Sequence, residues 1–311
     1  MKKINELLGT KYPLIQGGMA NIATGEFAAA CSNAGALGMI ATGGLDAEGL
    51  VRQIRIASSL TDKPFGVNMM LMMPDIDAMA EAAAEEGIRI VTTGAGNPGK
   101  YMNLWKTHGM TVIPVCASVL LAQRMVRIGA DAIIAEGTES GGHVGEMTTM
   151  ALVPQMCDAV DVPVIAAGGI ADGRQLAAAY ALGAQGAQIG TVLLTSRECP
   201  IHENYKQALL EARDNSTVVT GRSINAPVRI LKNRMSRAYL QKERSGASLE
   251  ELEQYTLGSL RKAVFEGNTC DGSLMAGQVC GQLKEIRPLA DIFAELDSGA
   301  EAVLRGLQQA V

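Results

Sequence analysis

The residues of this chain that are best suited to chemistry lie in one segment, 136–190. The segment opens with Glu136 and reaches His143 through a run of small and polar residues, Gly-Thr-Glu-Ser-Gly-Gly. Histidine titrates near neutral pH, so it can accept or release a proton. The glycines beside His143 give its side chain room to enter a cleft. We therefore expect His143 to be catalytic, with a surface or satisfied core histidine as the plain alternative.

The same segment contains two glycine turns, each at the end of an apolar run. Gly168-Gly169 ends one run and Gly190-Thr191 ends the next. Small residues let backbone N–H groups approach phosphate oxygens, and a helix N-terminus adds a favourable dipole. Either turn alone could require glycine only for a positive φ angle. Together, at successive strand ends, they predict a phosphate-binding site.

These positions require strands that end side by side, and the chain has the pattern for such strands. Apolar runs alternate with helix-like segments that often end at glycine, and the connections are short. Such alternation is typical of parallel βα units, and eight units close a barrel whose active site lies at the carboxyl ends of the strands. We therefore predict an α/β fold, a (β/α)8 TIM-type barrel, with an open doubly wound sheet as the alternative. The strands are expected at 13–16, 37–41, 65–69, 89–93, 111–115, 131–135, 162–166 and 186–189.

The alternation stops after Thr191. Residues from about 199 to 283 are rich in charge and helix-like, with no strand alternation, so they predict a mostly helical cap inserted after the eighth strand. The amphipathic segment 286–309 predicts the closing helix of the barrel. The expected domains are the barrel, 1–198, the smaller cap, 199–285, and the closing helix, 286–311.

Composition narrows the class of protein. The 311 residues are 48% hydrophobic but only 4% aromatic, which is typical of the aliphatic cores of parallel α/β folds. A net charge of −5 gives no reason to expect nucleic acid or a membrane surface as a partner. The six cysteines show no CxxC pair and no metal-ligand spacing, so we expect free thiols and no metal site. The chain has no recognisable signal peptide or membrane span, so a cytoplasmic protein is expected.

A local excess of positive charge lies in the predicted cap, between Gly221 and Arg244. Its only acid is Glu243, in a chain whose net charge is −5. A solvated helix face is the plain interpretation. A docking patch for an acidic partner, or for the phosphate of a dinucleotide, is the alternative. The bases are Arg222, Arg229, Lys232, Arg234, Arg237, Lys242 and Arg244.

Seven segments, spread over nearly the whole chain, carry a resemblance to a known family. They are YPLIQGGMA (12–20), KPFGVNMML (63–71), VTTGAGNPGKYM (91–102), AEGTESGGHVGEMTTM (135–150), PVIAAGGIADG (163–173), QIGT (188–191) and SLMAGQ (273–278). With these segments the chain resembles the flavin-dependent enoyl-acyl-carrier-protein reductase II family, within the wider group of nitronate monooxygenase-like flavoproteins. The Gly-Asn-Pro-x-Lys-Tyr segment favours the reductase, and so does Glu136, because nitronate monooxygenases typically carry glutamine at the position of Glu136.

The resemblance implies a barrel that holds FMN, with NADH or NADPH as co-substrate, and suggests a homodimer. It implies that His143 is the catalytic residue. An acyl carrier protein would present the substrate, with possible docking at Arg229, Lys232, Arg234 and Arg237. The residues implied to hold the flavin are Gly17, Gly18, Met19, Ala20, Asn68, Glu136, Gly141, Gly142, Gly168, Gly169, Gln188, Ile189, Gly190, Thr191, Met275, Gly277 and Gln278.

The expected function is that of an enoyl-acyl-carrier-protein reductase of fatty acid biosynthesis, in which hydride passes from NAD(P)H through FMN to a trans-2-enoyl thioester. His143 would hydrogen-bond the thioester oxygen, where negative charge develops, or supply the α-proton. One alternative is a nitronate monooxygenase, which would oxidise alkyl nitronates with FMN and oxygen. Another is a flavin- or acyl-chain-binding module without turnover, against which Glu136 and His143 argue.

Overall fold

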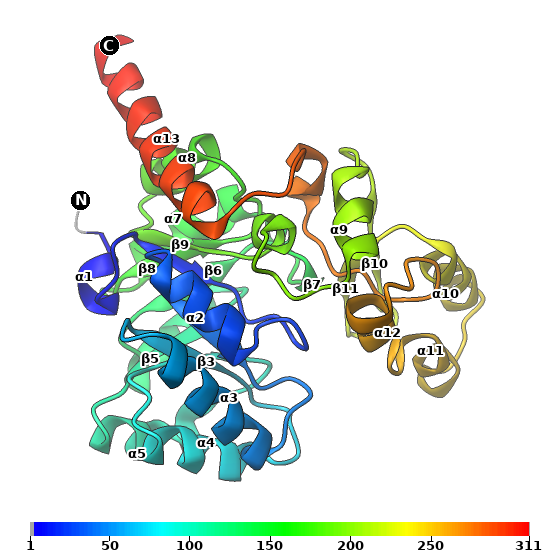
Figure 1. Cartoon of the computed structure of the whole chain (residues 1–311), viewed down its shortest axis with the longest axis horizontal. Helices are drawn as coiled ribbons and strands as arrows, with labels where there is room; N and C mark the ends of the chain where they lie inside the picture. Colours follow the sequence, from blue (N-terminus) through cyan, green and yellow to red (C-terminus); the bar gives the residue numbers. More distant parts are fainter. Residues whose placement is uncertain (1–2, 311) are drawn as a thin grey trace.

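The computed structural model describes residues 3–310, and its main feature is a barrel of eight parallel strands (Figure 1). The strand order is β1-β9-β8-β6-β5-β4-β3-β2. Backbone hydrogen bonds between Leu14, Gln16 and Leu37 join β1 to the start of β2 and so bring the two ends of the sheet together. The predicted TIM-type barrel is confirmed, and the open sheet is wrong. The strands are β1 (Leu14–Gln16), β2 (Gly38–Ala41), β3 (Phe65–Met70), β4 (Ile90–Gly94), β5 (Thr111–Cys116), β6 (Ile133–Glu136), β8 (Val164–Ala167) and β9 (Gly186–Ile189).

Helices follow the strands, and side-chain caps fix where several of them begin. Thr24, Asp46 and Ser118 each accept a hydrogen bond from a backbone N–H of the following first turn. Asp172 forms a capping box. These caps satisfy N–H groups that have no partner within the helix. The helices of the barrel are α2 (Gly25–Asn33), α3 (Ala47–Leu60), α4 (Ile76–Glu85), η1 (Pro98–Lys100), α5 (Met102–Thr107), α6 (Val119–Arg127), α7 (Thr149–Ala159) and α8 (Gly173–Ala181).

Apolar side chains fill the amino-terminal end of the barrel. Ile15, Met39 and Ile165 are fully buried in one cluster. Leu8 of the first helix, α1 (Asn5–Leu8), and Ile4 just before that helix complete the cluster. The N–H of Ile4 also donates to Gln185 O, at 2.8 Å. Since this end is closed, the carboxyl ends of the strands form the face on which a site can be built.

The cap, as we call residues 199–285, contains strands that were not predicted. β10 (Thr217–Thr220) and β11 (Val228–Leu231) pair antiparallel, and β11 pairs with β7 (Gly142–His143) from the barrel. The cap is mostly helical, as predicted, but its two strands were not foreseen because each has only four residues, too few for a clear alternation. The other elements are α9 (Glu203–Leu210), α10 (Arg234–Arg244), α11 (Leu249–Thr256), α12 (Ser259–Glu266) and η3 (Gln278–Gln282).

The chain returns to the barrel with α13 (Leu289–Ala310), the predicted closing helix. It packs on α8, where Gly173 and Gly299 lie so close that a Cβ on Gly299 would be 3.2 Å from the Gly173 Cα. Figure 1 shows α13 beside α8, at the opposite side of the barrel from the cap. Across residues 3–310, no helix is long and apolar enough to cross a membrane.

Candidate active site

The loop after β6, residues 137–145, is tied to the cap through β7. His143 lies opposite Val228 of β11, and Gly142 lies opposite Arg229. Figure 1 shows β7 and β11 next to each other where the barrel meets the cap. The backbone position of His143 therefore depends on both parts of the molecule.

The imidazole of His143 is available to a ligand. Its side chain is exposed, and it has no hydrogen-bond or ion-pair partner within residues 3–310. The protein packed around the ring nevertheless lowers the pKa of His143 from its ordinary value, because it removes water from the charged form. At neutral pH the ring is therefore mainly uncharged, with one N–H to donate and one nitrogen to accept.

Arg229 holds the same loop from the cap side. Its Nε and Nη2 donate to the carbonyl oxygen of Thr138, at 3.1 and 2.9 Å, and its Nη1 donates to Thr217 Oγ1 at 3.2 Å. Only 6% of Arg229 is exposed. Its assignment to a docking patch is therefore wrong, because the guanidinium is used inside the molecule. Nothing in the run of bases around Arg229 distinguishes it from its exposed neighbours.

Glu136 ends β6 with a half-buried side chain. Burial raises the pKa of its carboxyl to about 7, and a hydrogen bond from Ser140 Oγ, at 3.3 Å, partly opposes that shift. At neutral pH the carboxyl therefore exists in both protonation states. It can donate as well as accept a hydrogen bond, which an ordinary surface glutamate cannot do.

A segment of the cap, residues 275–278, lies directly against the loop. A Cβ on Gly141 would be 2.7 Å from the carbonyl carbon of Ala276. The N–H of Gly277 donates to Thr191 Oγ1 at 2.9 Å, and that of Gln278 donates to Glu139 O, also at 2.9 Å. The structure thus brings the predicted residues of the cap together with those of β6 and β9.

The two predicted glycine turns form one side of this site. Gly168 and Gly169 have φ angles of 90° and 74°, which favour glycine. The N–H groups of Gly169 and Gly190 have no acceptor among residues 3–310. The hydroxyl of Thr191 accepts from Gly277, so its hydrogen remains available to a ligand oxygen. These groups suit an anion such as phosphate.

The opposite side comes from β1 and β3. A Cβ on Gly18 would lie 2.3 Å from the Asn68 side chain, and Gly17 N donates to Ile189 O at 2.7 Å. Met19 also approaches this turn, because a Cβ on Gly190 would be 3.7 Å from its Sδ. The residues predicted at 17–20, at Asn68 and at 188–191 are therefore neighbours in space.

Buried polar atoms without partners supply an independent indication of a ligand. Gln188 Oε1 is buried without a donor among the described residues. A buried acceptor without a donor lowers the stability of the fold, unless a bound ligand supplies the donor. A flavin ring carries polar N–H and C=O groups, and FMN adds a phosphate. The donors and acceptors present here therefore fit FMN.

Two further residues of this kind escaped the sequence analysis. Gln16 Nε2 and Thr93 Oγ1 are also buried without partners among residues 3–310. Gln16 ends β1 immediately before Gly17, and Thr93 lies near the end of β4. Their place at the carboxyl ends of strands was a signal that could have found them.

Known proteins resemble this chain over nearly its whole length. The sequence model described as nitronate monooxygenase matches residues 2–299. A (3aS,4S,5R,7aS)-5-hydroxy-7a-methyl-1-oxo-octahydro-1H-indene-4-carboxyl-CoA dehydrogenase of Mycobacterium tuberculosis is 31% identical, with 94% of each chain covered. A probable nitronate monooxygenase of Staphylococcus saprophyticus is also 31% identical, with 89% of this chain and 91% of that protein covered.

Solved structures are similar as well. FabK from Thermotoga maritima superposes with a TM-score of 0.97 and 42% identity, covering 100% of this chain and 99% of that one. The nitroalkane oxidase from Streptomyces ansochromogenes gives a TM-score of 0.86 and 26% identity, covering 98% and 99%.

Proposed function

We propose that this chain, which belongs to the nitronate monooxygenase family, is an FMN-dependent enoyl-acyl-carrier-protein reductase. Its substrates would be trans-2-enoyl thioesters, and NADH or NADPH would supply the hydride. The observation that carries this proposal is the likeness to FabK, at 42% identity over the full chain, which supports a reductase. The nitroalkane oxidase structure, at 26% identity, is more distant.

FMN would be held by the residues that surround the glycine turns. Gly169, Gly190 and Thr191 would donate to its phosphate, and Gln188 and Asn68 would meet its polar groups. Bound FMN would supply the hydride chemistry between the nicotinamide and the β-carbon of the substrate. The chain has to orient the substrate and manage the proton and charge that follow.

His143 is proposed to stabilise the thioester oxygen. Negative charge develops there as the β-carbon gains hydride, and a fixed donor lowers the barrier. A neutral imidazole with no partner among residues 3–310 can provide that donor. Fixing the backbone of His143 through β11 reduces the motion that would weaken such a hydrogen bond.

Glu136 is proposed to contact the flavin from the end of β6. A carboxyl with a pKa of about 7 can donate to an acceptor on the ring or accept from a donor. The ability to donate or to accept a hydrogen bond suits the flavin ring, because its protonation differs between its oxidised and reduced states. The proposal gives Glu136 a binding role and leaves the substrate to His143.

A nitronate monooxygenase is the second candidate, and several of the curated relatives favour it. Those of the staphylococci carry that name at about 30% identity. A pair of assays on purified, FMN-loaded protein separates the two functions. The proposal predicts NAD(P)H oxidation with a crotonyl thioester and no oxygen uptake with an alkyl nitronate. The reverse result would favour the monooxygenase. The homodimer is a further proposal, to be tested by light scattering.

A further inference from the structure

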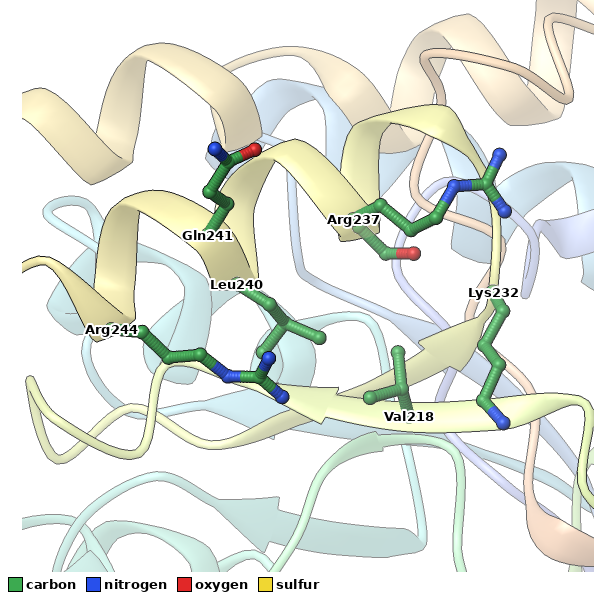
Figure 2. Close-up of a pocket in the computed structure, with 7 residues that line it drawn as sticks. Val218, Lys232, Arg237, Leu240, Gln241 and Arg244 are labelled. Atoms are coloured by element: carbon green, nitrogen blue, oxygen red, sulfur yellow. The ribbon is translucent and has the colours of Figure 1, made fainter.

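A groove in the cap carries positive charge that the catalytic proposal does not use. It lies between α10 and the strands below it, and its volume is about 560 Å³. Figure 2 shows α10 crossing above the strand that carries Val218, with basic side chains at both ends of the groove. The labelled lining residues are Val218, Lys232, Arg237, Leu240, Gln241 and Arg244.

The helix presents one face to this groove. Arg237, Leu240, Gln241 and Arg244 have the spacing i, i+3, i+4, i+7, which places them on a single side of α10. The two arginines are two turns apart, or about 10 Å along the axis. Leu240 lies between them, and Val218 faces it from β10. The groove thus has an apolar middle and cationic ends.

Arg237 and Arg244 of the groove are not neutralised, whereas Arg234 at the start of the same helix is. Arg234 forms an ion pair with Asp271. Arg237 and Arg244, both exposed, have no hydrogen-bond or ion-pair partner within residues 3–310. They are therefore free to meet a partner that carries negative charge.

We propose that this groove is the docking site for an acidic amphipathic helix of the acyl carrier protein. Two carboxylates one heptad apart on a helix match the spacing of Arg237 and Arg244, and an apolar side chain between them would meet Leu240. The inference rests on the proposed function, which supplies a carrier-bound substrate.

The sheet of the cap relates this groove to the active site. In the order β10-β11-β7, the strand below the groove is two strand spacings, or roughly 10 Å, from the strand that contains His143. A flexible thioester arm can cross that distance.

The docking residues proposed here differ from those predicted from the sequence. Lys232 and Arg237 are common to both sets, and Arg244 is added. Arg229 is excluded because it is buried, and Arg234 because it is paired with Asp271.

The test compares the same enoyl group on two carriers. FMN-loaded parent and an Arg237→Glu/Arg244→Glu variant are assayed with enoyl-acyl-carrier protein and with enoyl-CoA. We expect KM for the carrier-protein substrate to rise about tenfold, with kcat nearly unchanged, while both constants for enoyl-CoA stay within about twofold. Arg and Glu have similar helix propensities, so α10 should persist. Flavin content and circular dichroism verify that the variant is folded, and Arg237→Gln/Arg244→Gln replaces it if it is not.

Arg124→Glu on α6 is the matched control, because Arg124 is exposed and has no hydrogen-bond or ion-pair partner among residues 3–310. This control variant should leave KM and kcat unchanged for both thioester substrates. An unchanged KM for the carrier-protein substrate in the double variant contradicts the docking site while leaving the reductase intact. An equal loss of activity with both thioesters also contradicts the docking site. A KM that rises for NAD(P)H and not for the carrier-protein substrate contradicts it as well. A parent enzyme that reduces neither thioester contradicts the proposed function and removes the partner with it.

Discussion

Arg229 of the cap donates two hydrogen bonds to the carbonyl oxygen of Thr138, in the loop that runs from Glu136 to His143. A charged donor on the cap thus sets the position of a loop that begins at a strand of the barrel. The contact joins segments 91 residues apart in sequence. It links the placement of the candidate catalytic residue to the folding of the cap.

Replacing Arg229 should therefore weaken both the fold and flavin binding. Arg229→Met leaves the Thr138 carbonyl unpaired, so we expect a loss of about 2 kcal/mol in the free energy of unfolding and about tenfold weaker FMN binding. Urea unfolding and the recovery of flavin fluorescence measure the two effects. Thr217→Val, which removes only the Nη1 contact, is the control and should change little. Equal losses in the two variants would show that the Thr138 contact is unimportant.

His143→Ala should keep FMN but lose turnover. Removing a donor aimed at the developing oxyanion costs about 100-fold in kcat, while KM for NAD(P)H should not change. The assay is reduction of a crotonyl thioester by protein whose flavin content has been verified. His108→Ala, on an exposed histidine at the end of α5, should retain parental activity. A His143→Ala variant with the parental kcat contradicts the catalytic assignment.

Glu136 should make the stability depend on pH. Its pKa is raised from 4.5 to about 7 in the folded protein, so between these values the folded state holds a proton that the unfolded state has released. Stability conferred by the neutral carboxyl is therefore present below pH 4.5 and lost as the pH rises through 7. Glu136→Gln removes this dependence.

Urea unfolding of flavin-free protein at pH 5 and pH 8 measures the effect. From pH 5 to pH 8, the free energy of unfolding of the parent should fall by about 2 kcal/mol more than that of Glu136→Gln. This figure allows for solvent at a half-buried carboxyl. Glu81→Gln on α4, at an exposed glutamate, should show no such gain. A Glu136→Gln protein whose stability follows the parent at both pH values would rule out the raised pKa.

The close approach of the cap to the loop can be tested with one methyl group. In Gly141→Ala the new Cβ would lie 2.7 Å from the backbone of Ala276, so residues 275–278 must move. We expect a loss of about 2 kcal/mol and weaker FMN binding. Gly94→Ala, where no atom lies within 4 Å of the new Cβ, is the matched control and should bind FMN normally. Comparable FMN affinity in both variants would mean that the cap segment is not part of the site.

The barrel was predictable because its information is local. Apolar runs, helix caps and glycines recur along the chain, and the prediction for β9 at 186–189 matches the observed Gly186–Ile189. The two glycine turns could be associated because the carboxyl ends of parallel strands meet on one face. Residue types and a general rule of topology were therefore sufficient to predict the barrel and the shared position of the two glycine turns.

Contacts between distant segments were not predictable in this way. β7 has two residues and pairs with a strand of the cap, so neither partner shows a pattern of its own. Arg229 belongs to a run of bases that resembles a solvated face, and only the folded structure reveals its burial and its contacts with Thr138 and Thr217. The orphaned Gln188 Oε1 likewise becomes visible only when the surrounding atoms are placed.

The central claim is that one site passes hydride from NAD(P)H to an enoyl thioester. FMN-loaded protein is mixed anaerobically with NADH or NADPH, and then with a crotonyl thioester, while the flavin absorbance is followed. We predict that the nicotinamide bleaches the flavin and that the thioester restores its colour, with one saturated thioester formed per flavin. A flavin that NAD(P)H cannot bleach, or whose colour returns only when oxygen is admitted, would contradict the account.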